Sequence, residues 1–309
     1  MTGAGTQRIG LVIGQLTVGG AEGQLLQVVR RLGPRFEPVV YSLSARPTAL
    51  RSTLAAQGVA VREVTGRGVV RATRLAAALR ADGVAIAHSW LFIANAYVAA
   101  AKLAGAPWQL VTSARNCKVQ GRFSRIANAV AFRASARIVV NSADVQSYIV
   151  REYRAPADRI CVIANGVDTE RFHPAATGAD QGPLHVVTVG RLVRQKNHAL
   201  FLEAARRLLD RGVAARFTIV GDGPLRAELE ARAAALGLAA TVTFAGERDD
   251  VDAILRTASL FWLTSSWEGM PNAVLEALAS GVPVVVTAVS GTRELVEPGR
   301  QGYIVGLDD

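Results

Sequence analysis

The stretch "SSWEGMPNAVLEALASGVPVV", residues 265–285, joins a Gly/Pro loop to a helix and to the start of a strand. Pro271 suits the first turn of a helix because its missing N–H needs no partner there, and Gly281 suits the position just after the last turn. The unpaired N–H groups at a helix start are electropositive and favour an anion such as a phosphate. Two carboxylates, Glu268 in the loop and Glu276 in the helix, accompany this start. The stretch therefore predicts a loop–helix unit that holds a charged ligand.

Comparable units repeat along the chain, because short β-rich runs alternate with amphipathic segments almost throughout. Near-continuous apolar strands separated by helices are typical of a parallel sheet covered on both faces, and right-handed crossovers then give a doubly wound domain. The expected strands are 8–14, 37–43, 59–64, 84–88, 109–113, 136–141 and 159–165, then 184–190, 215–221, 241–246, 258–264, 282–287 and 302–305.

A segment rich in Gly, Pro and small polar residues separates the two sets of strands. We therefore predict an α/β protein with an N-terminal domain over 1–168, a linker over 169–183 and a C-terminal domain over 184–309. Two such domains facing each other would enclose a cleft, into which the strand ends direct ligand loops.

The net charge of +10 is unevenly distributed. Residues 1–165 carry a balance of +14 and residues 166–309 one of −4, and no acidic residue occurs from 83 to 143. This asymmetry indicates an anionic partner for the first half, although an Arg-rich, solvated face would give the same counts. The cations lie in a Rossmann-type pattern with no nucleic-acid-binding motif, so we expect no nucleic-acid partner.

The cysteines and the N-terminal sequence indicate where in the cell the protein is located. Cys117 and Cys161 are far apart and lack metal-ligand neighbours, so we expect ordinary buried thiols. The N-terminus does not read as a signal peptide, and no run approaches the ~20 apolar residues of a membrane span. We predict a cytoplasmic protein whose contact with a membrane, if made, is peripheral at its inner face.

Several candidate binding or catalytic residues follow predicted strands. Arg191 and Lys196 come after the strand that ends at Gly190, and cations before a helix suit a diphosphate. In the first half, "GG" at 19–20 precedes a helix and His88 ends a strand. The pattern is not G-x-G-x-x-G and lacks the acidic residue of a dinucleotide site, so we reject an NAD site. Solvated cations, tight turns and a structural histidine remain alternatives.

Together these motifs resemble glycosyltransferase family 4 over nearly the whole chain. The resemblance rests on "GRLVRQK" (190–196), "VGDGP" (220–224), "VTFAG" (242–246) and above all "EGMPNAVLEALASGVPVV" (268–285), with "GGAE" (19–22), "AHSW" (87–90) and "VIANGVD" (162–168) in order. It implies the GT-B fold of two facing Rossmann-like domains. It also implies a retaining hexosyltransferase that uses a UDP- or GDP-sugar and a glycan or lipid-linked acceptor, in exopolysaccharide or cell-envelope glycan synthesis.

The resemblance also implies roles for individual residues. Glu268 would bind hydroxyls of the donor sugar, Glu276 the ribose, and His88 the transferred sugar, while Arg191 and Lys196 would clamp the diphosphate as it leaves. Phe244 to Gly246 would lie near the base. The further donor-binding positions are Gly19, Gly20, Gly190, Gly246, Gly269, Met270, Pro271 and Asn272. We identify no Asp-x-Asp metal motif, so we predict no metal requirement and no cofactor besides the donor.

Residues 121–137, "GRFSRIANAVAFRASAR", are expected to form a helix. Arg122, Arg125, Arg133 and Arg137 fall on one side of it, and Phe123, Ala127, Val130 and Ala134 on another. This fits an anionic membrane surface bound through 115–137. It equally fits a helix that packs its apolar face on the sheet and leaves its arginines in water.

Two other functions remain open at this point. One is another GT-B nucleotide-sugar enzyme, such as an epimerase or a phosphorylase-like enzyme. The other is a non-catalytic nucleotide-sugar-binding fragment, because family members extend some tens of residues beyond a position such as 309. We therefore expect the second domain to be incomplete.

Overall fold

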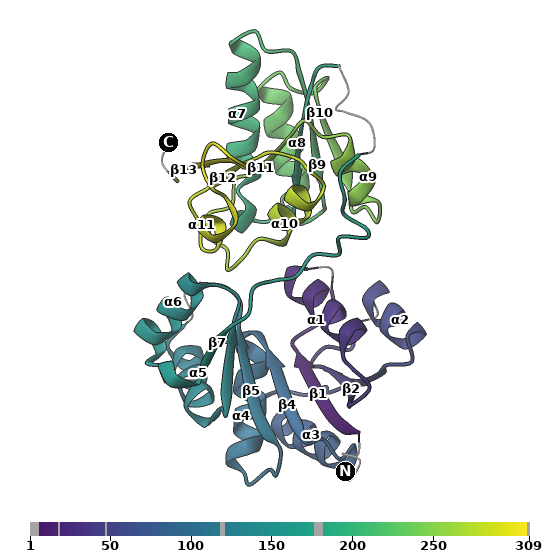
Figure 1. Ribbon diagram of the computed structural model, residues 1–309, viewed down its shortest axis with the longest axis vertical. Coiled ribbons are helices and arrows are strands. Elements are labelled where there is room, and N and C mark those ends of the chain that lie inside the picture. Colours follow the sequence, from purple (N-terminus) through teal and green to yellow (C-terminus); the bar gives the residue numbers. More distant parts are fainter. Residues whose placement is uncertain (1–5, 18, 47, 118–120, 176–181, 308–309) are drawn as a thin grey trace. The chain divides into compact units, whose positions relative to one another are not determined.

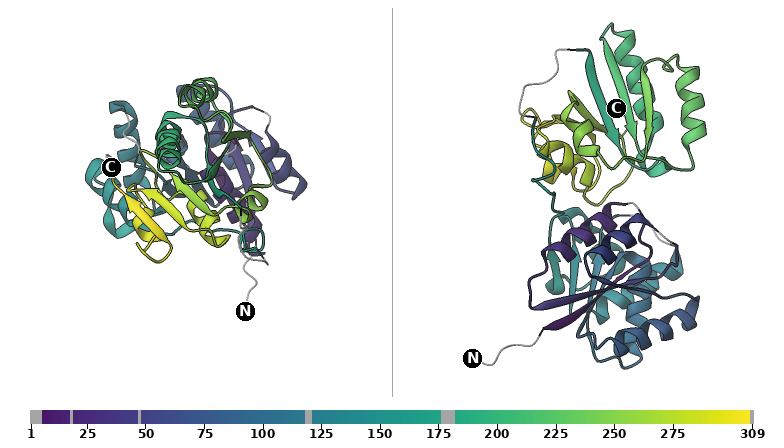
Figure 2. Two further views of the ribbon diagram at one scale, coloured as in Figure 1. Left: turned by 90° about the horizontal axis from the view of Figure 1, so that it is seen from above. Right: turned by 90° about the vertical axis from the view of Figure 1, so that its right-hand side faces the viewer.

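The computed structural model describes residues 6–17, 19–46, 48–117, 121–175 and 182–307. Contacts divide the chain into two compact units, Met1–Asn165 and Gly166–Asp309, three residues before the predicted boundary at 168. Each unit is an α/β sandwich in which helices cover both faces of a parallel sheet (Figures 1 and 2).

Seven parallel strands form the sheet of the first unit in its described residues, in the order β3-β2-β1-β4-β5-β6-β7. Their apolar runs are buried on both faces, as parallel strands require. The strands are β1 (Gln7–Ile13), β2 (Phe36–Ser42), β3 (Ala60–Glu63), β4 (Ile86–Trp90), β5 (Gln109–Ala114), β6 (Arg137–Val140) and β7 (Ile160–Val162).

The helices of the first unit cover the sheet in two groups. One hydrophobic cluster joins α1 and α2 to the sheet through Leu25 and Leu54, and two others join α3 to α6 through residues such as Leu75, Val98, Phe132 and Ile149. The helices are α1 (Gly20–Arg31), α2 (Ala49–Ala56), α3 (Gly68–Ala81), α4 (Leu91–Leu103), α5 (Arg122–Ala134) and α6 (Ala143–Tyr153).

The second unit has a smaller sheet of the same kind. In its described residues six parallel strands run in the order β10-β9-β8-β11-β12-β13. They are β8 (Leu184–Val189), β9 (Ala215–Val220), β10 (Val242–Gly246), β11 (Leu260–Leu263), β12 (Val284–Thr287) and β13 (Gly302–Val305), with α7 (His198–Asp210), α8 (Arg226–Ala235), α9 (Val251–Arg256), α10 (Asn272–Ala279) and α11 (Thr292–Leu295).

The order of strands places the candidate loops. In the first sheet the chain moves one way from β1 to β3 and the other way from β4 onward, so the loops after β1 and β4 are neighbours. The loops after β8 and β11 are neighbours in the second sheet for the same reason. Ligands of open α/β sheets bind at such switch points, at the carboxyl ends of the strands.

The predicted strands are all present, with bounds that differ by at most three residues. The predicted linker 169–183 differs in part: Phe172 is buried in a core of the second unit and Pro174 packs against Gly281. These contacts assign 169–175 to the second unit, while 176–181 lie outside the described residues.

The helix expected at 121–137 is shorter than predicted. α5 ends at Ala134, and Arg137 is the first residue of β6, because the chain re-enters the sheet there. Of the segment 115–137, residues 118–120 lie outside the described part. No helix among the described residues combines the length and apolar character needed to cross a bilayer.

Candidate functional site

An ion pair joins the two loops at the switch point of the second sheet. The Nζ of Lys196, in the loop after β8, lies 2.6 Å from the Oε1 of Glu268, in the loop after β11. The exposed fractions of the two side chains are 19% and 10%. Since each residue follows a different strand, the neighbouring positions of β8 and β11 create the pair. Lys196, Gln195 and Ser265 are the side chains that contact the Glu268 carboxylate, and no second carboxylate does so in the part of the chain that the structure describes.

Further hydrogen bonds orient Glu268. The Ser265 hydroxyl donates to Oε1 at 2.8 Å, and the Gln195 amide donates to Oε2 at 3.4 Å and to the Trp267 carbonyl at 2.9 Å. The Thr264 hydroxyl donates to the Lys196 carbonyl at 3.0 Å, which is a further link between the two loops. Oε1 is thus occupied, while Oε2 accepts only one long bond and can take a hydroxyl of a ligand.

Glycines let these loops approach each other. A Cβ on Gly190 would lie 3.2–3.3 Å from the methylene carbons of Lys196, so a side chain there would crowd Lys196. A Cβ on Gly223 would lie 2.6 Å from the Leu192 carbonyl oxygen, so the turn after β9 supports the loop that carries Arg191. Gly246 ends β10 with a φ of 70°, and its carbonyl accepts from the Gly221 N–H at 2.7 Å. Two predicted donor positions, Gly190 and Gly246, thus favour glycine, the first because Lys196 packs closely against it and the second because of its positive φ.

Like Arg194, Arg191 is an exposed cation of this loop. It forms no ion pair among the described residues. Its guanidinium is therefore available to an anionic ligand beside the Lys196–Glu268 pair. His198, at the start of α7, is buried, and burial lowers its pKa to about 4, with the charge of Lys196 adding to this effect. His198 is thus a neutral support for the loop.

The loop 268–271 leads into α10 as predicted. Pro271 is the N-cap, Asn272 begins the helix and no side chain caps the helix start. Met270 is buried, and Gly291 packs against the carbonyl of Gly269 with a φ of 78°, a conformation that glycine adopts without strain. The N-terminal end of α10 thus lies next to Glu268, where its partial positive charge favours an anion.

Glu276 lies one turn further along α10. Burial raises its pKa, and the charges of Arg171 and Lys196 partly offset this rise. Among the described residues its carboxylate makes no hydrogen bond or ion pair. A desolvated carboxylate without donors is costly unless a ligand supplies them.

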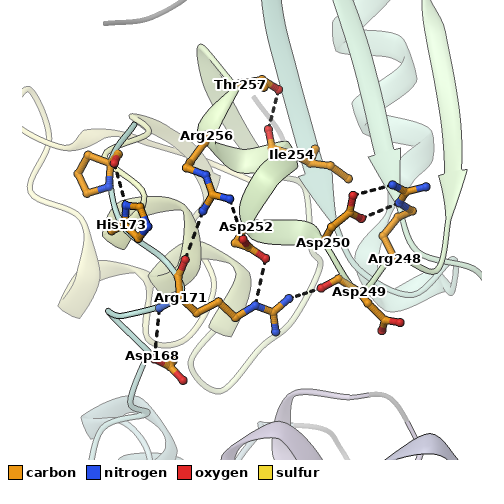
Figure 3. Close-up of polar contacts among 11 residues, drawn as sticks. Asp168, Arg171, His173, Arg248, Asp249, Asp250, Asp252, Ile254, Arg256 and Thr257 are labelled. Carbon is orange, nitrogen blue, oxygen red and sulfur yellow. Dashed lines mark hydrogen bonds and ion pairs between the residues drawn. The ribbon is translucent and has the colours of Figure 1, made fainter. Parts of the chain in front are cut away.

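Arg171 is held near this site by α9 (Figure 3). Its Nε lies 3.1 Å from Asp252, it also donates to the Asp249 carbonyl, and Arg256 bridges Asp252 and the Arg171 carbonyl. Asp250 pairs with Arg248 at 2.6 Å. Asp250 and Asp252 do form an Asp-x-Asp pattern, so the sequence-based statement that none is evident was wrong. Both carboxylates are paired with arginines, and no metal-binding cluster occurs among the described residues.

In the first unit, the predicted residues lie at the other switch point. His88 is within β4, two residues before its end rather than at the end, and its Nε2 lies 2.7 Å from the Ser113 hydroxyl. Burial, and secondarily the charge of Arg115, lower its pKa to about 3, so the ring is neutral. Gly19 is the N-cap of α1, which begins at Gly20, and the Glu22 carboxylate fills the space next to Gly19.

Sequence reasoning missed three residues of the second unit. Gln195 and Ser265 contact Glu268, and Arg171 lies in the predicted linker. Gln195 and Ser265 could have been found from the sequence, because they lie in the loops after the predicted strands that correspond to β8 and β11. Arg171 carries none, since its partners lie about 80 residues away in α9.

Comparison with known proteins identifies the family and the fold of the chain. Residues 169–307 match the family "Glycosyl transferases group 1", and residues 18–171 match "Glycosyltransferase Family 4". An Escherichia coli UDP-Gal:alpha-D-GlcNAc-diphosphoundecaprenol alpha-1,3-galactosyltransferase is 32% identical over 191 residues, which are 58% of this chain and 49% of that protein. A Rhizobium meliloti lipopolysaccharide core biosynthesis mannosyltransferase, LpsB, is 38% identical over 167 residues, 48% of this chain and 46% of that protein.

The chain thus matches about half the length of these curated relatives. Among solved structures, Anabaena Alr3699/HepE in complex with UDP-glucose superposes with a TM-score of 0.85 at 20% identity, covering 97% of this chain and 85% of that one. At this identity the likeness shows the fold. With two parallel α/β sheets and family matches that together run from residue 18 to 307, the chain belongs to the group 1, family 4 glycosyltransferases and has their GT-B fold.

Proposed function

We propose that the protein is a retaining glycosyltransferase that moves a sugar from a nucleotide diphosphate sugar to a glycan or lipid-linked acceptor, in exopolysaccharide or cell-envelope glycan synthesis. The observation that carries this proposal is the Lys196–Glu268 pair beside the unpaired Arg191 at the switch point of the second sheet. The names of the relatives, which include a UDP-galactose-dependent enzyme, and the UDP-glucose complex favour UDP over GDP.

The geometry suits the chemistry of this reaction. The bond between the sugar C1 and the diphosphate oxygen breaks, and its electron pair leaves with the phosphate. The acceptor hydroxyl attacks C1 from the same face, and its proton goes to the departing phosphate. Arg191, the remaining N–H donors of Lys196 and the N-terminal end of α10 would bind charge that grows in the transition state. No metal is needed for this charge balance.

The two carboxylates would position the donor. Lys196 and Ser265 occupy Oε1 of Glu268, which leaves Oε2 for a sugar hydroxyl. The carboxylate of Glu276, unpaired and partly desolvated, would accept hydrogen bonds from the two ribose hydroxyls. Both roles bind neutral hydroxyls with ionised carboxylates, which gives charge-assisted hydrogen bonds.

Calorimetric titration with UDP, GDP and ADP tests the donor site. We expect one of these nucleotides to bind, and Glu276→Gln to weaken its binding at least tenfold. Glu228→Gln is the matched control, because Glu228 is an exposed glutamate of α8 in the same unit. Equal binding of the nucleotide by both variants would refute the ribose assignment. No nucleotide binding by the folded wild-type protein would refute the proposed function.

An acceptor-dependent product assay separates the remaining alternatives. A transferase releases the nucleoside diphosphate faster when a polyprenyl-diphosphate-linked sugar is added, and the acceptor gains mass. An epimerase instead returns an altered nucleotide sugar without an acceptor, and a binding fragment releases nothing.

We further propose that α5 places the enzyme on an anionic membrane surface. Its exposed apolar residues Phe123, Ile126 and Val130 are 89%, 56% and 40% exposed and fall on one stripe, whereas its buried residues are Asn128, Ala131 and Phe132. The alternative in which Phe123 and Val130 pack on the sheet is therefore wrong. Arg122 and Arg133 flank the stripe, while Arg125 is paired with Glu152. An exposed apolar stripe beside cations fits a monotopic helix. This would make the enzyme peripheral at the cytoplasmic face.

Vesicle flotation tests this surface. We expect binding to vesicles with anionic lipid, weaker binding at high salt, and a loss of at least fivefold in Phe123→Ser. Val213→Ser, at an exposed valine of the second unit, is the control. Equal affinity for neutral vesicles, or no effect of Phe123→Ser, would contradict the proposal.

A further inference from the structure

Arg115 occupies the point at which four neighbouring strand ends of the first sheet meet. It follows β5, while Trp90 ends β4, Asn141 follows β6 and Asn165 follows β7. The guanidinium lies over the Trp90 ring at 4.5 Å and donates to Oδ1 of Asn165 at 2.9 Å. The Asn141 amide lies 3.5 Å from the Arg115 carbonyl. Stacking and hydrogen bonding thus fix the plane of the guanidinium.

No carboxylate neutralises this cation. Arg115 forms no ion pair among the described residues, and burial alone lowers its pKa to about 10. The sequence from 83 to 143 contains no acidic residue that could serve. A desolvated charge without a counter-ion costs free energy, and proteins retain such costs mainly where function requires them. Within the described residues, one hydrogen bond, to Asn165, uses the five N–H donors of the guanidinium.

We propose that Arg115 is the acceptor-phosphate residue: its guanidinium binds a phosphate of a lipid diphosphate to which the acceptor sugar is attached. This rests on the proposed transferase function and names the acceptor class. A planar guanidinium whose orientation is fixed matches phosphate oxygens in pairs. The helix that follows, α5, begins at Arg122 and presents the exposed apolar Phe123 as its second residue, which is suited to contact the hydrocarbon of a lipid. The diphosphate of the donor is assigned to Arg191 and Lys196 in the other unit.

A purely structural role makes the opposite prediction for stability. If Arg115 only braced Trp90 and Asn165, Arg115→Gln would lower the melting temperature and leave ligand affinity unchanged. If the charge serves a ligand, removing it relieves an uncompensated desolvation cost. The melting temperature then stays the same or rises while the ligand is lost.

The experiment titrates geranyl diphosphate, inorganic pyrophosphate, geraniol and UDP into the full chain and its variants. We expect Arg115→Gln to weaken the binding of geranyl diphosphate at least tenfold and to leave the binding of UDP unchanged. Arg191→Gln should weaken the binding of UDP and leave that of geranyl diphosphate unchanged. Arg35→Gln is the control, because Arg35 is exposed just before β2, at the opposite edge of the same sheet. If pyrophosphate binds more tightly than geranyl diphosphate, the site belongs to free phosphates and the assignment to a lipid is overturned. If geraniol binds as tightly as geranyl diphosphate, the proposed contact with the phosphate is overturned.

Arg115→Lys keeps the inference testable if Arg115→Gln does not fold. Lysine retains the charge and loses the planar fork and the stacking on Trp90, so we expect geranyl diphosphate to bind three- to tenfold more weakly. Unchanged affinity in both variants, or loss of UDP in place of geranyl diphosphate, overturns the assignment. Absence of UDP binding in the wild type would instead refute the donor site, and the Arg115 result would stand separately.

Discussion

Breaking the Lys196–Glu268 pair should destabilise the second unit by an amount that the structure sets. Unit charges 2.6 Å apart attract by about 6 kcal/mol at an effective dielectric constant of ~20, and desolvation of both ions opposes this. Removing one partner of a buried pair typically costs ~3–5 kcal/mol, because the other charge is left uncompensated. The side chain of Lys196 is 19% exposed, so the pair is only partly buried and the lower end of this range applies. We therefore expect about 3 kcal/mol for Glu268→Gln.

Differential scanning calorimetry of a double-mutant cycle checks this value. Glu268→Gln and Lys196→Met should each lower the melting temperature of the second unit by ~10 °C, since 1 kcal/mol corresponds to roughly 2–4 °C for a domain of this size. The double variant should lose little more than either single variant, because it leaves no lone charge. The coupling free energy should therefore be about 2 kcal/mol.

Additive effects would refute the reasoning. If the stability lost by the double variant equals the sum of the losses of the two single variants, the coupling free energy is zero. The two residues then do not stabilise each other. Glu228→Gln, which changes an exposed glutamate of the same unit, should shift the melting temperature by less than 2 °C by comparison.

Three further outcomes follow from particular contacts. Gly223→Ala should weaken UDP binding at least tenfold in calorimetry, because its Cβ would lie 2.6 Å from the Leu192 carbonyl and must displace the loop of Arg191; normal affinity would show that the loop yields without loss. His198 has a folded pKa of about 4, below the ~6.5 of an unfolded chain, so its contribution is complete above pH 6.5 and falls by up to about 3 kcal/mol as the pH drops to 4. Urea unfolding of His198→Leu should show a flatter pH dependence, and an identical slope would contradict the shifted pKa. Thr287→Val removes the 2.7 Å hydrogen bond to the Ser265 carbonyl and should cost about 1 kcal/mol in urea unfolding, whereas a neutral result would show that water replaces it.

Much of the architecture could be predicted from local chemistry. Apolar runs such as "VVTVG" and "FTIVG" favour buried parallel strands whatever their neighbours are, and Gly and Pro mark where each strand or helix ends. Since parallel strands end at one edge of the sheet, the positions of Arg191 and Glu268 relative to their own strands could also be predicted. The resemblance to a known family then supplied the roles, which spacing alone left open.

The pairings required the folded chain. Lys196 and Glu268 are 72 residues apart, and they meet because β8 lies next to β11 rather than because of any local preference. The helical wheel of α5 correctly grouped Phe123 with Val130, but it does not say which side faces the sheet; the sheet is covered by Ala131 and Phe132, which leaves the apolar stripe in solvent. Periodicity along a chain describes an element by itself, whereas strand order and the choice of the packed face depend on long-range contacts that arise only when the core is formed.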